Sequence, residues 1–302
     1  MRTAPWIDLW TPDEAALRAA LPEGVHDITV ARLLQPVDPG SPARPRLETR
    51  DHYVFGVFAA PGYDGQRIAI DEVNVVITRD AIVTVHKTPR SVGSLTFDAA
   101  VATARRTGID PGQALFTIVD EVAERFLSVI DRFEDSIDEL EDHVADWPHA
   151  EIRTRISATR HDISHLRRLL TPTRDAARRV VDGRVELGDA DELFPRDVEL
   201  RFADAYDKLL RATDALDLTR DLLAGVRDFH QAEIANEQNE VVKRLAAIGS
   251  ILLVPTFIVG LYGQNFRGMP AYDWEYGYLW SWFLIVSTTV GQVWYFRRRN
   301  WL

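Results

Sequence analysis

The chain has 302 residues, which suits about two domains, and a formal net charge of −11 at pH 7. That charge argues against a general nucleic-acid-binding protein, which needs a basic face to neutralise phosphates. The sequence contains no cysteine, which excludes disulfides, thiolate metal sites and cysteine nucleophiles.

The first hundred or so residues predict mixed α/β structure. The opening MRTAPWIDLW lacks a charged segment followed by an apolar one, so we expect no cleaved signal peptide. A short helix is expected over 12–21 after a Thr11 cap, and a second helix over 98–107. The Pro- and Gly-containing segment 40–46 predicts a loop. Four segments that alternate or are rich in β-branched residues predict strands: 26–34, 52–60, 67–80 and 81–89.

Helical spacing begins at Pro111, and apolar residues then recur every three or four positions up to Val144. The outer face of this long helix is acidic over 131–142. A break is expected at Trp147-Pro148, and the next helix carries arginines from 153 to 179. The acidic helix could fold back on the basic one as a charge-matched hairpin, although exposed ion pairs stabilise little; alternatively, each face is solvated by itself.

A third helix is expected to start near Pro195 and to run into the first apolar segment, over about 196–262. At 1.5 Å per residue this helix would be roughly 100 Å long. Its apolar stripe has no cover in a small monomer, so the sequence predicts an oligomer.

Two segments without charged residues lie near the C-terminus, between Arg244 and Arg267 and between Glu275 and Arg297. Each can span a bilayer as a helix of about 20 residues, and tryptophan and tyrosine flank them as aromatic belts. Basic residues precede the first segment and follow the second, so the positive-inside rule predicts cytoplasmic N- and C-termini and an external loop over 263–275. We therefore expect a multi-pass protein of the inner or plasma membrane.

Common catalytic motifs are absent: the sequence has no P-loop, no GxSxG and no HExxH. His161 and His165 have the i, i+4 spacing of zinc ligands, but no third ligand is in view and arginines surround them. An enzyme is therefore not expected.

One face of the predicted membrane helix and its extension could line a pore. Several copies around an axis can enclose a polar path that two spans alone cannot. Apolar rings can gate such a path by dewetting, and carboxamide or carbonyl rings can hold a hydrated cation; ordinary helix packing is the alternative. The residues that recur on this face are Asp228, Asn239, Val242, Gly249, Leu253 and Thr256.

Five segments resemble the CorA family of divalent-cation channels, in order along the chain. The segment NEVVKRLAAIGSILLVPTFIVGLYGQNF (239–266) resembles the family's pore helix, which ends in the signature YGMNF. FADAYDKLL (202–210) and the stretch from Gly225 to Glu240 resemble the long cytoplasmic helix. DEVNVVITRDAIVTVHKTP (71–89) resembles the N-terminal sheet, and RRRNWL (297–302) resembles the basic tail.

The resemblance implies a fold, an oligomeric state, a membrane location and a function. The expected fold is an α+β cytoplasmic domain with long helices plus a two-helix transmembrane hairpin, in a funnel-shaped homopentamer in the lipid bilayer. The expected domains are an α/β domain at 1–110, a long-helix stalk at 111–242 and a pore domain at 243–302. The expected function is uptake of Mg²⁺, with Co²⁺ or Ni²⁺ as further ions, gated by metal bound in the cytoplasm.

The resemblance also implies site residues. Gly263 and Asn265 would form the outer selectivity ring with Gln264 between them, and Val242 and Leu245 would match the hydrophobic constriction. The expected pore lining is Asn239, Val242, Leu245, Gly249, Leu253 and Thr256. The expected metal-binding acids are Asp204 with Asp207 beside it, at a regulatory site between subunits, and Asp228 near the pore axis.

Two departures from the family pattern concern the ion. Gln264 stands where the signature has methionine, and the loop motif MPEL reads MPAY at 269–272, without its glutamate. A zinc transporter similar to ZntB, with or without proton coupling, is therefore the first alternative. A membrane-anchored coiled-coil sensor or scaffold that conducts nothing is the second.

Overall fold

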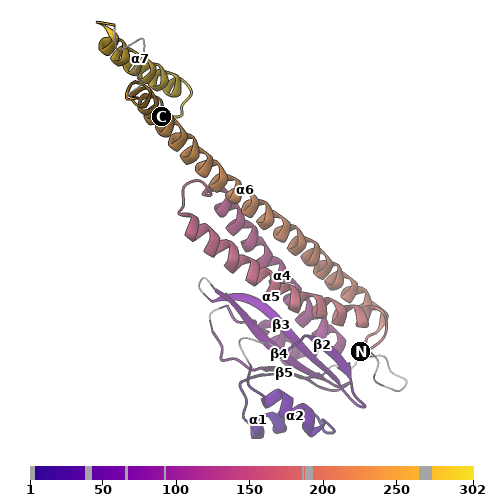
Figure 1. Cartoon of the computed structure of the whole chain (residues 1–302). Coiled ribbons are helices and arrows are strands. Elements are labelled where there is room, and N and C mark those ends of the chain that lie inside the picture. The colour runs from indigo at the N-terminus through magenta and orange to yellow at the C-terminus, as the bar shows by residue number, and fades with distance from the viewer. Residues whose placement is uncertain are drawn as a thin grey trace. The chain divides into compact units, whose positions relative to one another are not determined.

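The computed structural model describes residues 4–37, 43–64, 67–91, 93–185, 187, 193–264 and 274–302. The chain forms two compact units, Met1–Arg227 and Asp228–Leu302. The α+β organisation predicted for the N-terminal part and the predicted long helices are both present (Figure 1).

A five-stranded sheet forms the centre of the first unit, in the order β1-β5-β4-β3-β2. β1 runs parallel to β5, whereas all the other neighbouring strands are antiparallel. The strands are β1 (Trp6–Trp10), β2 (Arg46–Thr49), β3 (Val54–Asp64), β4 (Arg67–Ile77) and β5 (Ile82–His86).

Both faces of this sheet are covered. Side chains alternate along β4, so Val75 and Ile77 enter the core beneath the long helices, whereas Val76 joins a second core. That second core includes Leu17 of α1 (Glu14–Ala20) and Leu33 of α2 (Asp27–Leu34). Figure 1 shows α1 and α2 on one side of the sheet and α4 and α5 on the other.

Three N-terminal predictions differ from the structure. Segment 26–34, predicted as a strand, is the helix α2, because Thr29, Val30 and Leu33 are buried at helical spacing against the second core. The cap of α1 is Asp13, whose carboxylate accepts from the Ala16 N–H, and not Thr11. Strands β1 and β2 were not predicted, and β2 begins at the end of the segment expected to be a loop.

The predicted helices after residue 97 are present. They are α3 (Asp98–Thr107), α4 (Pro111–Asp142), α5 (His149–Val181), α6 (Arg196–Tyr262) and α7 (Gly277–Arg298). Asp110 starts α4 by accepting a hydrogen bond from the Gln113 N–H, with Pro111 at the first helical position. The break predicted at Trp147-Pro148 separates α4 from α5.

Helices α4, α5 and the first part of α6 pack together in the first unit, and α4 and α5 do form the fold-back hairpin (Figure 1). Apolar side chains fill the space between the three helices, among them Phe126, Leu166 and Phe202. Arg155 of α5 reaches Glu139 of α4 at 3.6 Å, but both side chains are about half exposed, so this pair adds little stability.

Candidate ion-conduction site

The second unit contains the end of α6 and all of α7, paired side by side (Figure 1). The Gln292 side-chain N–H donates to the Ser250 carbonyl at 3.3 Å, which connects the two helices near the middle of their pairing. Ala247 lies one helical turn before Ser250 on the same face of α6 and is fully buried. Phe296 lies one turn after Gln292 and is also buried. This face of α6 therefore packs against α7.

The pore-lining residues predicted from the sequence lie on the opposite side of α6. At about 100° per residue they fall within an arc of about 120°, centred well away from the face that contacts α7. Every one of them is exposed within a single chain; Val242 and Leu253, for example, are 61% and 70% exposed. The structure thus places the six residues in one line: Asn239, Val242, Leu245, Gly249, Leu253 and Thr256.

The chemistry of this line changes along the helix. Apolar side chains at Val242, Leu245 and Leu253 alternate with small or polar positions. A Cβ atom added at Gly249 would meet no other atom within 4 Å. The Thr256 hydroxyl donates its proton to the Leu252 carbonyl at 2.7 Å, so both lone pairs of its oxygen stay available to a ligand. One helix face of this kind can contribute one wall of a narrow path, but one chain cannot enclose it.

The predicted outer ring follows directly at the end of α6. The Gly263 N–H donates to the Val259 carbonyl at 2.8 Å, and a Cβ atom at Gly263 would approach that carbonyl oxygen to 3.1 Å. The Gln264 N–H reaches the Leu261 carbonyl at 3.4 Å, and its side chain is exposed. Asn265, the third predicted member of the ring, lies outside the described residues, as does loop segment 265–273.

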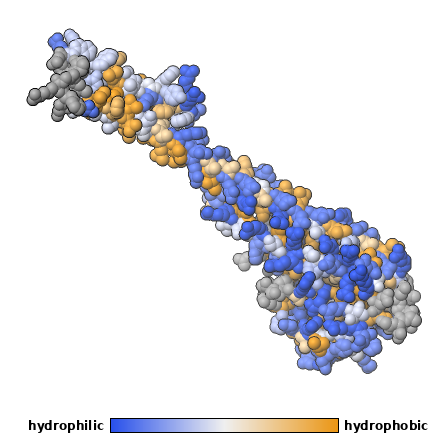
Figure 2. Space-filling view, turned by 45° about the vertical axis from the view of Figure 1, so that its right-hand side comes forward, coloured by the Kyte–Doolittle hydropathy of each residue, from blue (hydrophilic) through white to orange (hydrophobic). Residues whose placement is uncertain are grey.

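Large apolar side chains are exposed on the second unit, where Figure 2 shows orange patches among white and blue residues. Within the described part of the chain, α6 is the helix long and apolar enough to cross a membrane: an 18-residue window has a mean hydropathy of 2.1, and 6% of it is buried. Helix α7 carries no charge from Gly277 to Phe296, but its Trp, Tyr and Gln residues lower its hydropathy below that of α6. Exposed apolar side chains on both helices require lipid or further copies of the chain as a cover.

The predicted metal-binding acids Asp204, Asp207 and Asp228 are all exposed on α6. Among the residues that the structure describes, no three His, Cys, Asp or Glu side chains lie close enough to hold a metal ion. The zinc pair His161 and His165 therefore has no third ligand in this part of the chain. A metal held by the acids of α6 would need ligands from a second copy.

The sequence matches the family described as CorA-like Mg²⁺ transporter protein over residues 3–298, nearly the whole chain. The chain belongs to the CorA family. The resemblance seen in the five sequence segments is thereby confirmed. As a member of the CorA/ZntB group, the protein is a membrane transporter of divalent metal ions and not an enzyme.

Three relatives of this CorA-family chain illustrate the range of metal ions for which such proteins are named. It is 26% identical over 286 residues to the cobalt/magnesium transport protein CorA of Thermotoga maritima, covering 92% of this chain and 77% of that protein. It is 27% identical over 197 residues to the zinc transport protein ZntB of Enterobacter sp. strain 638, covering 64% and 57%. The complete structure of the CorA magnesium transporter from Methanocaldococcus jannaschii superimposes with a TM-score of 0.76 at 21% identity, covering 98% of this chain and 91% of that one. This last likeness supports the fold.

Proposed function

We propose that this CorA-family protein is a homopentameric channel that takes up Mg²⁺ passively across the plasma membrane. The observation that carries the proposal is the line of exposed, uncharged residues along α6, on the side away from α7. Five copies with these lines turned toward a common axis would enclose a path of alternating apolar and polar rings. The apolar side chains would then contact one another or a dewetted pore instead of water.

The outer ring would meet the ion first. Mg²⁺ loses its water reluctantly, so neutral oxygens from Gly263, Gln264 and Asn265 would contact the hydrated ion and not strip it. Along the path, Val242 and Leu245 would form the narrow apolar barrier, while Asn239, Gly249, Leu253 and Thr256 line the rest. Co²⁺ and Ni²⁺ are further candidate ions, because their hydrated forms present the same water shell.

Cytoplasmic Mg²⁺ would also regulate the channel. Asp204 and Asp207 are exposed, and acids of this kind repel each other between subunits unless a cation bridges them. Metal bound there would hold a closed ring, and its loss would shift the population toward an open one. Asp228 would attract cations near the axis. In this arrangement the N- and C-termini lie in the cytoplasm, 1–110 and 111–242 form the cytoplasmic domain and stalk, and 243–302 forms the pore domain.

Zinc transport is the alternative that two observations favour. The match to ZntB covers 64% of this chain, and Gln264 replaces the methionine of the signature. Family membership leaves the non-conducting scaffold without support.

Flux into liposomes tests the proposal and separates the two ions. We expect Mg²⁺ entry driven by membrane potential, unchanged by a pH gradient, and lost in Asn265→Ala because a water-binding carboxamide is removed from every copy. Asn236→Ala is the matched control, since Asn236 is exposed on α6 but lies off the predicted pore line. Zn²⁺ entry that is faster than Mg²⁺ entry and depends on the pH gradient would instead identify the protein as a proton-coupled zinc transporter. Undiminished Mg²⁺ flux through Asn265→Ala would contradict the proposal that Asn265 forms part of the selectivity ring.

A further inference from the structure

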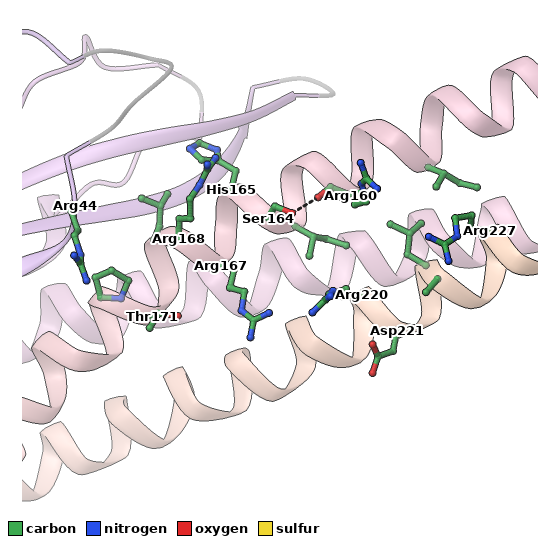
Figure 3. A pocket seen from close by; sticks show the side chains of 16 residues that line it. Arg44, Arg160, Ser164, His165, Arg167, Arg168, Thr171, Arg220, Asp221 and Arg227 are labelled. Carbon is green, nitrogen blue, oxygen red and sulfur yellow. Dashed lines mark hydrogen bonds between the residues drawn. The ribbon is translucent and has the colours of Figure 1, made fainter.

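A groove opens between α5 and α6 in the first unit, apart from the proposed pore line (Figure 3). Its volume is about 1230 Å³. Apolar side chains such as Ile156, Ile163 and Leu223 form part of its lining. A groove of this size accommodates a metabolite or cofactor with room to spare.

The polar lining of this groove is mostly arginine. Among the lining residues that the structure describes, Asp221 is the one acid, although the chain as a whole has 46 acidic residues against 35 lysines and arginines. From the sequence, the arginines of α5 could either face the acidic side of α4 or be solvated by themselves. The structure instead combines several of them with arginines from α6 and from the segment before β2. The six that line the groove, named here the arginine groove, are Arg44, Arg160, Arg167, Arg168, Arg220 and Arg227.

Neighbouring carboxylates neutralise only part of this charge. Arg167 pairs with Asp217 at 3.3 Å. Within the described part of the chain, no ion pair joins Arg160, Arg168 or Arg220 to a carboxylate, and all three side chains are exposed. Burial and the positive charge of Arg168 lower the pKa of His165, which also lines the groove. The groove therefore carries a positive charge that a bound anion would offset.

The spacing of the arginines indicates an extended anion. Arg160 and Arg167 lie seven residues apart on α5, and Arg220 and Arg227 lie seven residues apart on α6. Seven residues correspond to about 10 Å along a helix. A chain of phosphates is long enough to contact both members of a pair, with a different phosphate at each guanidinium. Arginine also suits phosphate oxygens, because its planar guanidinium donates two parallel hydrogen bonds.

We propose that the arginine groove binds a polyphosphate anion, with a nucleoside triphosphate as the ligand of best fit. The phosphate chain lies along the arginines of α5 and α6. Ile163 and Leu223, each 3% exposed, form the apolar floor beneath the base and ribose. An inorganic polyphosphate offers the same charge without the apolar part, so comparing the two ligands identifies the source.

Calorimetric titration of the full-length protein in detergent tests this site. The probes are ATP, inorganic tripolyphosphate, orthophosphate and adenosine, with free Mg²⁺ held constant so that chelation by ATP does not disturb metal sites. The groove variant is Arg160→Gln/Arg220→Gln, which removes one guanidinium from each helix. The matched control is Arg153→Gln/Arg201→Gln, which removes exposed arginines of the same two helices that lie outside the groove.

We expect ATP and tripolyphosphate to bind the wild-type protein, and ATP to bind more tightly because of the apolar lining. The groove variant should lose about tenfold or more in affinity, the control should stay within about twofold, and added salt should weaken binding to the wild type. Orthophosphate and adenosine should bind weakly or not at all. Equal affinity for ATP and tripolyphosphate would assign the site to the phosphate chain alone.

Three results would overturn the proposal. They are no binding of ATP or tripolyphosphate by the wild type at about 1 mM, unchanged affinity in the groove variant, and salt-independent binding. Loss of the oligomer in the groove variant, together with no polyphosphate binding by the wild type, would instead make the groove a contact between copies. Because binding is measured without transport, the result does not depend on which ion the channel carries.

Discussion

Gly249 leaves open space beside the backbone on the exposed line of α6. If this line faces the axis of an oligomer, five leucine side chains at position 249 would fill a narrow passage. We therefore expect Gly249→Leu to reduce Mg²⁺ flux at least about tenfold while the helix itself gains slightly in propensity. Liposome flux and thermal melting measure the two effects.

Gly291 of α7 is the matched control. It is exposed, it lies about 100° around α7 from Gln292, and an added Cβ would also meet no atom within 4 Å. Gly291→Leu should leave the flux nearly unchanged. Equal loss of flux in both variants would show that bulk on either helix disturbs the protein, and would remove the support for a pore line at Gly249.

Single residues of the candidate site were predictable where chemistry repeats along one helix. Leu253 and Thr256 could be assigned to one face from the sequence alone, because the helical period fixes which residues share a face. Their position opposite α7 could not, because it depends on which side of α6 the Gln292 side chain contacts. The exact chemistry of the ring at Gln264 also depends on the neighbouring copies, which no single chain contains.

At the level of elements, helices with long amphipathic patterns were predicted best. The start of α4 at Pro111 and the continuity of α6 follow from caps and from a sustained apolar period. Helix α2 was mistaken for a strand because its local sequence, with Ile28 and Val30, favours β structure, and packing against the second core overrides that preference. Strand β1 was missed because its five residues pair with β5, about eighty residues away in sequence.

A buried ion pair joins the middle of β4 to the segment after β5. Glu72 accepts from Lys87 at 2.8 Å and from the Asn74 amide at 3.0 Å, and its side chain is 2% exposed. Glu72→Gln would leave the Lys87 ammonium buried without a counter-charge, so we expect a loss of about 3 kcal/mol and a lower melting temperature. Circular dichroism of the purified protein measures the change.

The exposed pair Arg18–Glu14 provides the control, since Glu14→Gln should change the melting temperature by less than the experimental error. The double variant Glu72→Gln/Lys87→Met should recover much of the stability, because it removes both buried charges. If Glu72→Gln melts like the wild type, the pair does not stabilise the sheet.

The same pair predicts a pH dependence. Burial opposes ionisation of Glu72, but hydrogen bonds from Lys87 and Asn74 and the charge of Lys87 hold its pKa below the ordinary 4.5. A lowered pKa contributes stability above the unfolded value and loses it as the pH falls through the folded value. The stability difference between wild type and Glu72→Gln should therefore be full at neutral pH and shrink below about pH 4.5. A difference that stays constant well below about pH 4.5 would contradict this assignment.

At the level of the whole molecule, the proposed regulation requires several copies. Asp204 is exposed and the described part of one chain offers no complete metal site, so bound Mg²⁺ would hold neighbouring subunits together. Mg²⁺ should slow proteolysis of the wild-type protein, and Asp204→Ala should lose most of that protection because a ligand is removed from every subunit contact. Digestion time courses with and without Mg²⁺ measure the effect.

Asp138→Ala is suited as the control, because Asp138 is equally acidic and exposed but lies on α4. It should keep the protection. Identical digestion patterns for Asp204→Ala and wild type would exclude Asp204 from a regulatory metal site.

The arginine groove is a feature of the whole molecule that could not be predicted from the sequence alone. Its arginines come from α5, from α6 and from the segment that holds Arg44, three stretches separated by many residues. Each stretch by itself predicts only a solvated basic surface. Packing of the helices in three dimensions brings the charges to one groove, and no periodic pattern reports that packing.

The hydrogen bond from Gln292 to Ser250 has a consequence for biogenesis. The two C-terminal helices belong to one polypeptide and contact each other directly. Each newly made chain can therefore insert into the bilayer as a folded hairpin and associate with other copies later by lateral diffusion. A chain with a damaged ring would then still insert and still be recruited. Cells that make Asn265→Ala together with the intact protein should therefore lose far more than half of their Mg²⁺ uptake, since one variant subunit would inactivate the mixed oligomer that contains it.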